Sequence, residues 1–454
     1  EIEALIDPYL GGDDPVFGKI FPGTLSDFLI DFDKNTILES ELCIVFGPGA
    51  LLILSDALIC YIDVPKNEIQ YRSRAGEVVN LGMTRPIDPK AQYKRMYFID
   101  WPVLNRHKEA LLPEIDIVID DQYSTTITWC TGETFRRGLM TMSQHAFRVR
   151  PWFEPGVWGG DWIINRIERL NRNVVNYAWS FECIVPENGI VMVKNGIRLE
   201  CSFDFLMFAD AAAILGDSAT EFGTEFPIRF DFLDTFNGQN LSLQCHPSTN
   251  FIRSEFGESF TQDETYYMLD AAPDAKVYLG FQENIDPERF ETALKTSVQT
   301  GEPMDVERFV QVHPAKKHDL FLIPHETIHC SGKNGLVLEI SSTPYIFTFK
   351  MYDWMRLDLD GNPRPLNIDR AMKNLDFSCK GAIVKNDYIA TQKIIDEGPD
   401  WQVYHLSTHP KHFYEVFRME FQSEYTLEDN DKGHVMSLVE GNQIEVVTGD
   451  RTMK

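Results

Sequence analysis

The chain has 454 residues and a net charge of −27, from 69 acidic and 42 basic residues. This length exceeds what one hydrophobic core usually serves, so we expect about two to four domains. An apolar content of 43% is typical of globular proteins and excludes collagen-like, coiled-coil and disordered chains. The negative charge repels nucleic acid and anionic membranes, so we expect neither as a partner. For the same reason, an anionic small substrate needs a local cationic pocket.

The cysteines stand singly, and none belongs to a Cys-x-x-Cys pair. Several lie in apolar runs, as buried free thiols do. Free thiols persist in a reducing compartment, so we expect a cytoplasmic protein. The eight are Cys43, Cys60, Cys130, Cys183, Cys201, Cys245, Cys330 and Cys379.

Residues 1–148 alternate strand-like apolar runs with charged, helix-like stretches. The apolar runs include "ALICYIDV" (57–64) and "IDIVIDD" (115–121), and a helix-like stretch is "VLNRHKEALL" (103–112). This alternation predicts an α/β module.

The most apolar run of this module, residues 42–64, is long enough to raise the question of a membrane span. It contains the turn-forming sequence Gly47-Pro48-Gly49 and the charged Asp56. Because both interrupt a spanning helix, we expect two buried segments of a soluble domain, separated by a turn.

Two segments of the module, 54–74 and 93–120, resemble the central and lid regions of P-loop kinases of the uridine kinase and phosphoribulokinase type. The segment "FGPGALL" (46–52) lacks the GxxxxGK[ST] pattern and any lysine that could reach a phosphate. The resemblance therefore implies a kinase-like module without a P-loop, inactive as it stands.

From residue 149 to 375 the sequence consists mainly of short, aromatic-rich, strand-like runs separated by Gly, Pro and Asn turns. Such closely spaced strands predict a β-sandwich or barrel, interrupted by one helical insertion over residues 286–311. Residues 376–454 carry further strands and read as the start of a second β-domain. Because that domain has little room to close before Lys454, we expect the native chain to continue.

Four polar side chains lie on or beside the predicted strands of the second region. Gln244 and His246, in "LSLQCHP", share one face because successive strand side chains alternate. Glu264 and His329 lie on other strands, and a barrel interior can collect side chains that are distant in sequence. Imidazole and carboxylate groups suit Zn²⁺, Fe²⁺ or Mn²⁺, with an amide oxygen as a fourth ligand. The pattern predicts a metal site with one position open to water or substrate.

A second interpretation stays open on spacing alone. The chain has 11 histidines, so a His-Glu-His trio arises easily, and glutamine is an uncommon ligand. The same four residues could then be core or rim polar side chains whose hydrogen bonds are satisfied.

The segment "LSLQCHP" (241–247) also resembles the QxHP motif of the class I phosphomannose isomerases, which are zinc enzymes built from cupin β-barrels. Further segments resemble that family in the same order, from about residue 150 to the chain end. They are "PWFEPGVWGGDW" (151–162), "FPIRFDFLD" (226–234), "TQDETYYMLDAAPDAKVYLGF" (261–281), "FLIPHETIHC" (321–330) and "LEISSTPYIFTFKMYDWMRLDLDGNPRPLNI" (338–368).

The resemblance implies mainly-β cupin (jelly-roll) domains after the α/β N-terminal module. It makes Gln244, His246, Glu264 and His329 the ligands of one Zn²⁺ per chain, or of another divalent first-row metal. In the family, the metal and nearby groups hold an opened sugar phosphate while a proton moves between neighbouring carbons through an enediol. The implied reaction interconverts mannose 6-phosphate and fructose 6-phosphate, or close relatives.

The residues around the implied metal depart from the family pattern. Glu339, in "LVLEISS", matches an acidic residue that faces the pocket and is a candidate for proton transfer; alternatively it is a structural carboxylate paired with an arginine. Lys350 replaces a family Arg and Arg229 a family Lys, and both are candidate catalytic cations. A further family Lys is Gln262 here, and a family His is Asn367.

We therefore expect a metal-dependent aldose–ketose isomerase with a sugar-phosphate substrate, and a homodimer is one assembly compatible with the sequence. The alternative is a non-catalytic sugar or sugar-phosphate sensor fused to a pseudokinase-like module, favoured by the loss of the family Lys at Gln262. A third hypothesis, a sugar or nucleoside kinase, requires an ATP site that these residues do not supply.

Overall fold

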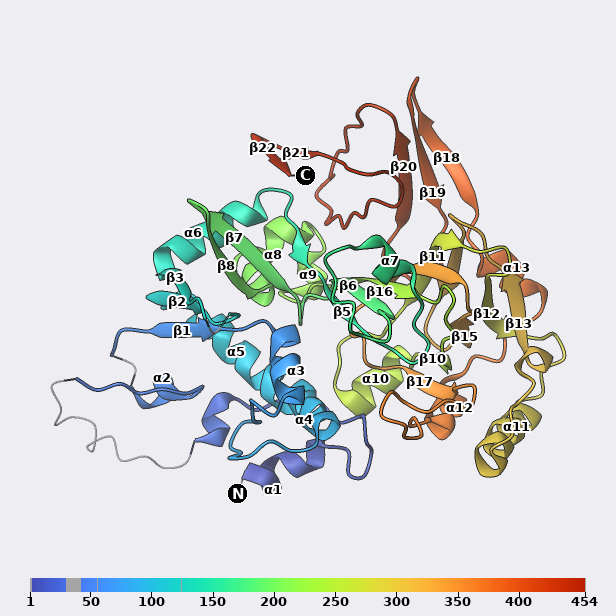
Figure 1. The fold of residues 1–454 in the computed structure, drawn as a ribbon, viewed down its shortest axis with the longest axis horizontal. Coiled ribbons are helices and arrows are strands. Elements are labelled where there is room, and N and C mark those ends of the chain that lie inside the picture. Colours follow the sequence, from blue (N-terminus) through green and yellow to red (C-terminus); the bar gives the residue numbers. More distant parts are fainter. Residues whose placement is uncertain (1, 30–41, 55, 124, 454) are drawn as a thin grey trace.

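Two antiparallel sheets form the centre of the protein in the computed structural model, which describes residues 2–29, 42–54, 56–123 and 125–453 (Figure 1). The six-stranded sheet has the order β14 (Leu320–Ile323), β11 (Glu264–Ala271), β16 (Gly335–Ser342), β9 (Ile228–Asp234), β6 (Trp179–Cys183), β5 (Trp152–Glu154). The five-stranded sheet has the order β13 (Val310–Pro314), β12 (Lys276–Phe281), β15 (His329–Ser331), β10 (Leu243–Cys245), β17 (Phe349–Tyr352).

The six-stranded sheet is buried on both faces because its apolar residues alternate between two cores. Leu233 and Val337 face the core that also contains Leu243 and other residues of the five-stranded sheet. Phe230 and Leu338 face the opposite core, against the helices behind the sheet. All eight residues of β16 are buried. The polar side chains on the inner face therefore lie between the two sheets.

The helical insertion is shorter than predicted. Helix α11 (Pro287–Thr300) begins after Asp286, whose carboxylate accepts hydrogen bonds from Glu288 N and Arg289 N. It ends at Gly301, whose φ of +73° stops the helix. A 3₁₀ turn then leads into β13, so the second half of the predicted insertion becomes a turn and an edge strand. Further helices around the sheets are α7 (Trp162–Arg166), α10 (Thr249–Phe256), α12 (Ile368–Asn374) and α13 (Ala382–Asp387).

The N-terminal region has a small sheet in which β1 (Cys60–Asp63) is parallel to β2 (Ile117–Asp120), and β3 (Thr128–Thr131) is antiparallel to β2. These strands confirm the strand predictions at 57–64 and 115–121. One helical segment combines α4 (Pro89–Arg95), a π-helical turn and α5 (Trp101–Leu111). The other helices are α1 (Ile2–Ile6), α2 (Ala50–Ile53), α3 (Lys66–Arg74) and α6 (Gly132–Ser143).

The prediction that residues 42–64 form two buried segments is wrong for both: in the second, Leu58 and Ile62 are 69% and 62% exposed, although β1 forms there. Leu42, Ile44 and Phe46 are 78%, 75% and 92% exposed, and residues 42–49, which are all described, contain no strand. An apolar run is buried only where another element covers it, and nothing in the described residues covers this one. No helix in the described part of the chain is long and apolar enough to cross a membrane.

The core of the N-terminal region continues past the predicted boundary at residue 148. The strands β4 (Val149–Arg150), β7 (Gly189–Lys194) and β8 (Ile197–Ser202) form a sheet beside α6 and the helices α8 (Asp204–Leu215) and α9 (Ala219–Phe222). Phe135 of α6 meets Phe205 of α8 edge-on, with ring centroids 5.1 Å apart. The domain boundary at residue 148 stays a prediction, but Phe135 and Phe205, which lie on either side of it, belong to one hydrophobic core.

A buried ion cluster also joins the two sides of residue 148. Asp204 Oδ2 lies 2.7 Å from Lys66 Nζ, and Asp204 Oδ1 lies 3.0 Å from Lys108 Nζ. Lys108 also reaches Asp63 at 3.4 Å, and all four residues are at most 6% exposed. Although burial acts to raise the pKa of Asp204, the two lysines hold it below its ordinary value. Charges this deeply buried require partners, which fixes α3, α5 and α8 against one another.

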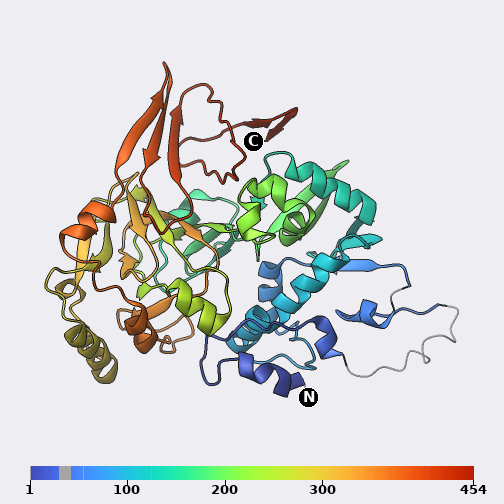
Figure 2. The same ribbon diagram turned by 180° about the vertical axis from the view of Figure 1, so that it is seen from behind.

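Aromatic side chains of the N-terminal region pack against the central sheets. Phe17 stacks on Phe347 with ring planes 14° apart, and Phe98 meets Phe347 edge-on. Ile20 N donates a hydrogen bond to Phe256 O at the end of α10, and both views show α4 beside that helix (Figures 1 and 2). The N-terminal region therefore covers one side of the central β-structure.

The last part of the chain forms a three-stranded antiparallel sheet that stands apart from the N-terminal region (Figure 2). Its strands are β18 (Gln392–Glu397), β19 (Trp401–Leu406) and β20 (Val416–Phe421), followed by the hairpin of β21 (Val446–Thr448) and β22 (Arg451–Met453). The assignment of 376–454 to the start of a second cupin-like domain stays a prediction.

We expect Phe98→Ala to lower the free energy of unfolding by about 3–5 kcal/mol, because a fully buried ring leaves a cavity between the N-terminal region and the sheets. Urea denaturation followed by circular dichroism measures the change. The matched control is Phe46→Ala, at a ring that is 92% exposed, with an expected change within about 0.5 kcal/mol. Equal effects of the two variants would contradict the packing described.

Candidate metal centre

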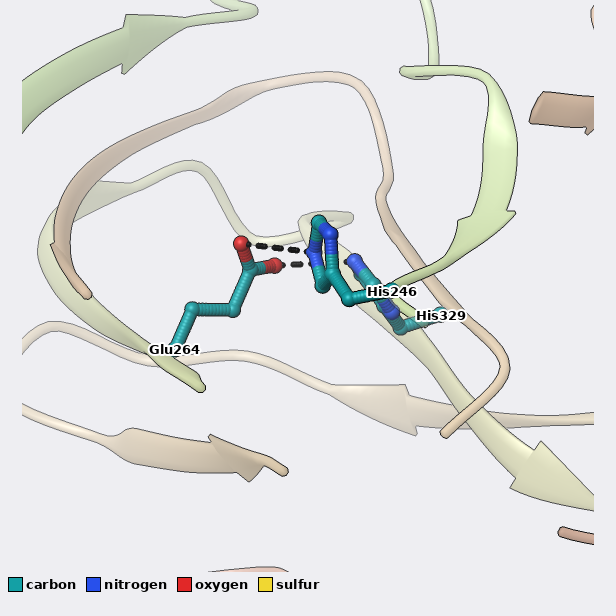
Figure 3. A group of neighbouring side chains, drawn as sticks. All are labelled: His246, Glu264 and His329. Carbon is teal, nitrogen blue, oxygen red and sulfur yellow. Dashed lines mark hydrogen bonds and ion pairs between the residues drawn. The ribbon is translucent and has the colours of Figure 1, made fainter. Parts of the chain in front are cut away.

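His246, Glu264 and His329 converge between the two sheets (Figure 3). Glu264 begins β11 of the six-stranded sheet, whereas His329 begins β15 and His246 follows β10 in the five-stranded sheet. Glu264 Oε2 lies 3.0 Å from His246 Nε2, and Glu264 Oε1 lies 2.8 Å from His329 Nε2. All three side chains are at most 1% exposed.

Backbone carbonyls orient both imidazoles. His246 Nδ1 lies 3.2 Å from Phe347 O, and His329 Nδ1 lies 2.9 Å from Thr327 O. A carbonyl oxygen only accepts hydrogen bonds, so we assign the ring proton to Nδ1 in both residues. The two Nε2 lone pairs then face the carboxylate of Glu264. This second contact through Nδ1 is typical of histidines that bind metals.

The three facing atoms need a positive charge between them. Although burial acts to raise it, the pKa of Glu264 lies well below its ordinary value, held down by His246 and His329. An ionised carboxylate opposite two imidazole lone pairs is repulsive unless a proton or a metal cation lies among them. Glu264 Oε1 also has no hydrogen-bond partner in the described residues. Two imidazole nitrogens and one carboxylate oxygen, all within 4.8 Å of one another, fit a divalent first-row metal.

Gln244 lies at the edge of this trio. Its Nε2 is 3.3 Å from His329 Nε2, and the residue is the cross-strand neighbour of His329 on one side and of Lys350 on the other. Cross-strand neighbours point to the same face, so all three side chains face the inside of the sandwich. A rotation of the amide by half a turn exchanges its nitrogen and oxygen, which would present Oε1 in the same place.

Lys350 is partly buried beside Gln244, and it makes no ion pair within the described residues. The pKa of Lys350 is lowered to about 8, mainly by burial and also by Arg364 and Arg356, whereas Asp353 acts in the opposite direction. Its backbone carbonyl accepts a 2.7 Å hydrogen bond from Asn367 N. Lys350 and Asn367, which both depart from the phosphomannose isomerase pattern, are thus neighbours in the fold.

A second polar group adjoins the trio through Gln262. The Gln262 Nε2 donates to Glu264 Oε2 at 3.0 Å and to Glu339 Oε1 at 3.2 Å. Glu339 Oε1 also accepts hydrogen bonds from Arg229 Nη2 and, at 3.0 Å, from Ser341 Oγ. Glu339 is therefore paired with an arginine, as the alternative interpretation of this residue expected. The side chain of Gln262 connects it to Glu264.

Burial dominates the electrostatics of this second group. It raises the pKa of Glu339 well above its ordinary value; Arg229 opposes the shift, and the nearby Asp231 and Glu264 add to it. Burial likewise raises the pKa of Asp231 to about 6, against the effect of Arg229. Arg229 serves both carboxyls, with its Nε 2.9 Å from Asp231 Oδ1. One guanidinium thus compensates two buried carboxyl groups.

Sequence reasoning did not single out Asp231 or Ser341. A signal was present, because each lies two residues along a strand from a predicted site residue, Arg229 or Glu339. Residues two apart share a face, so a polar side chain in an otherwise apolar strand next to a site residue belongs to the same space. Gln262 carries the same signal for its contact with Glu264, two residues along the chain, but its contact with Glu339 depends on the packing of β11 against β16.

Residues 1–144 match a domain family of unknown function, DUF8485. The mannose-6-phosphate isomerase ManA of Bacillus subtilis is 26% identical over 235 residues, 52% of this chain and 69% of that protein. The mannose-6-phosphate isomerase of Streptococcus mutans is 26% identical over 221 residues, 48% and 63% of the two chains. A solved structure of the Bacillus subtilis enzyme aligns with a TM-score of 0.48 and 20% identity, over 62% of this chain and 81% of that one.

These sequence matches make the chain a homologue of mannose-6-phosphate isomerases, which confirms the resemblance found in the sequence. The resemblance of the N-terminal region to P-loop kinases stays a prediction, because the family that matches there has no known function.

We expect Arg229→Met to lower the free energy of unfolding by about 3–5 kcal/mol, because it leaves two buried carboxyl groups without their cation. Arg74→Met is the matched control: its ion pair with Glu154 is 2.8 Å long but its side chain is 46% exposed, so a loss of about 0–1 kcal/mol is expected. Chemical denaturation at pH 7 measures both. A loss at Arg229 no larger than at Arg74 would show that the buried group is not held by this cation.

Proposed function

We propose that the protein is a metal-dependent aldose–ketose isomerase that acts on a sugar phosphate, namely mannose 6-phosphate and fructose 6-phosphate or close relatives. Its homology to enzymes of that name supports the reaction class. The observation that carries the proposal is the bridge of Gln262 between Glu264 and Glu339. The bridge puts a carboxyl group suited to proton transfer beside a trio suited to a metal. The two facing antiparallel sheets support the cupin (jelly-roll) fold as part of this proposal.

In the proposed site, His246, Glu264 and His329 hold one divalent ion per chain, and Gln244 adds its amide oxygen. We propose Zn²⁺, because two imidazoles and one carboxylate are a common zinc ligand set that leaves a position for water or substrate. When bound, the ion supplies an electrophile and a fixed template for the oxygens of the opened sugar.

The chain's own side chains move the proton. Glu339 takes it from the carbon next to the sugar carbonyl while the carbonyl oxygen gains a proton, which gives an enediol. Glu339 then returns its proton to the former carbonyl carbon while the hydroxyl of the adjacent carbon loses its own, so that the protons balance. Arg229 and Ser341 hold Glu339 Oε1 in position. Gln262 Oε1 is buried and has no hydrogen-bond partner in the described residues, so it can accept a hydrogen bond from a substrate hydroxyl. Lys350, on the same face as Gln244, supplies a positive charge for an anionic substrate.

We expect Glu339→Gln to lower kcat by about 10²–10⁴-fold, because the amide cannot accept the transferred proton. A coupled assay of mannose 6-phosphate and fructose 6-phosphate interconversion measures this, with metal content checked in each variant. Glu307→Gln is the matched control, at a side chain that is 57% exposed, and its kcat should not change. Absence of turnover in metal-loaded wild-type protein, on either sugar phosphate, would refute the isomerase proposal.

We expect His329→Ala and Glu264→Gln to lose the metal, whereas the wild-type protein and His434→Ala, at an exposed histidine, carry about one divalent ion per chain. Elemental analysis after dialysis measures the content and identifies the metal. Affinity should fall as the pH is lowered, because protons compete for the imidazoles and the carboxylate. Wild-type protein that binds no metal, yet isomerises the sugar, would contradict the assignment of these ligands.

A non-catalytic sugar or sugar-phosphate sensor is the second candidate, because Gln262 occupies the position of the family Lys and its uncharged amide is the group that bridges Glu264 and Glu339. A sensor would bind sugar phosphate, with a rise in melting temperature, and form no product. Gln262→Lys separates the two: a gain of turnover in this variant would show that the amide at this position is what limits catalysis.

The cellular location and the assembly of the protein are also proposals. All eight cysteines lie in the described residues and are free thiols, which supports residence in the cytoplasm. A homodimer is proposed as one assembly, and sedimentation of the purified chain would measure it.

A further inference from the structure

The hydroxyl group of Tyr266 is buried at the candidate metal centre and has no hydrogen-bond partner in the described residues. Tyr266 lies on β11 two residues after Glu264, so the two side chains share a face. Its cross-strand neighbour on β16 is Glu339, which points to that same face. The ring of Tyr266, which is 0% exposed, meets the imidazole of His329 edge-on, with ring centroids 5.9 Å apart. The side chain therefore lies among the trio and Glu339.

A buried hydroxyl without a partner is unusual, because leaving it unpaired costs free energy. Tyr267, the next residue, shows the ordinary arrangement. It is also buried, in the core on the other side of the sheet, and its Oη lies 2.7 Å from His318 Nδ1. A phenylalanine at position 266 would fill the core between the sheets without an unpaired polar atom. Packing therefore accounts for the ring of Tyr266 but not for its hydroxyl.

The other donors of the polar group around Glu339 are already engaged. Gln262 Nε2 donates to two carboxyl groups, the guanidinium of Arg229 donates to two, and Ser341 Oγ donates its single hydrogen to one. Among these side chains and Tyr266, the phenol hydroxyl is the donor that has no partner in the described residues. A ligand that enters this space therefore meets Tyr266 Oη as an uncommitted donor.

Tyr266 supplies a donor, and Gln262 supplies the matching acceptor. Burial raises the pKa of Tyr266 well above its ordinary value, and the nearby Glu264 and Glu339 add to the shift, so the phenol keeps its proton. Gln262 Oε1 is also buried and without a partner in the described residues, and its Nε2 adjoins the same two carboxyl groups. A free donor and a free acceptor beside one pair of carboxyl groups suit a ligand that has a carbonyl oxygen and a neighbouring hydroxyl.

We propose that Tyr266 Oη is a catalytic hydrogen-bond donor, which binds the carbonyl oxygen of the opened sugar while Gln262 Oε1 accepts a hydrogen bond from the adjacent hydroxyl. The site then recognises an α-hydroxycarbonyl compound, the unit that an aldose–ketose isomerase rearranges. When Glu339 takes the proton from carbon, negative charge develops on the carbonyl oxygen, and a fixed donor stabilises that charge. Tyr266 keeps its own proton throughout. This role rests on the proposed isomerase function and adds to it the group that stabilises the oxygen.

Tyr266→Phe removes this hydroxyl, and Tyr267→Phe is the matched control, because it removes a buried hydroxyl from the other face of the same strand. In the coupled assay with mannose 6-phosphate and fructose 6-phosphate, we expect Tyr266→Phe to lower kcat and kcat/KM together by about 10²–10³-fold. Tyr267→Phe should leave both unchanged, and elemental analysis should find the wild-type metal content in both variants. The melting temperature should fall in Tyr267→Phe, which leaves His318 Nδ1 without its partner, but not in Tyr266→Phe, which loses no hydrogen bond.

A second measurement does not require turnover. The compound 5-phospho-D-arabinonohydroxamate carries two adjacent oxygens that copy those of the enediol. Calorimetry should show that it binds Tyr266→Phe about tenfold or more weakly than it binds the wild-type protein and Tyr267→Phe.

The outcomes separate the role of Tyr266 from the proposed function. If hydroxamate binding weakens in this way but the wild-type protein turns over neither sugar phosphate, the isomerase proposal fails and the donor role stands. An active wild-type protein with unchanged kcat in Tyr266→Phe, unchanged hydroxamate binding in that variant, or a fall in its melting temperature as large as in Tyr267→Phe would each overturn the donor role. Absence of both turnover and hydroxamate binding in the wild-type protein would overturn both.

Discussion

A carboxylate buried between two apolar sheets must be compensated, and the centre of this protein is arranged around that requirement at Glu264. Two imidazoles from the opposite sheet face its oxygens, and backbone carbonyls hold both rings in that orientation. An apolar interior makes an uncompensated charge costly, so the two sheets cannot slide past each other without losing these contacts. The same demand for a positive charge makes the trio suitable for a metal ion.

The buried carboxyl groups around Glu339 are also compensated by a positive charge, which here comes from an arginine side chain. Arg229 compensates Glu339 and Asp231, and Gln262 connects this pair to Glu264. A glutamine can bridge two carboxylates through one amide nitrogen without adding charge, whereas a lysine would add a cation at that place. The chemistry open to the site therefore depends on which of the two occupies this position, and the rest of the polar network can stay as it is.

The N-terminal region is part of the same molecule physically as well as in sequence. Its aromatic residues pack on the loop that carries Phe347, and the carbonyl of Phe347 orients His246. It also supplies one wall of a cavity beside Trp179, through α3 and α4. A domain that closes one side of a β-sandwich in this way limits how ligands reach the interior, and it can bring polar groups to a surface that the sandwich alone would leave open.

The amino-acid sequence by itself determined which side chains share a face. Alternation along a strand put Gln244 beside His246 and would have put Asp231 beside Arg229, because the direction of a strand side chain is a local property of the backbone. Only the tertiary structure decided which faces meet: the bridge made by Gln262, the exposure of Phe46 in an apolar run, and the cavity beside Trp179. Each of these depends on contacts between segments far apart in the chain, and no local pattern specifies such contacts.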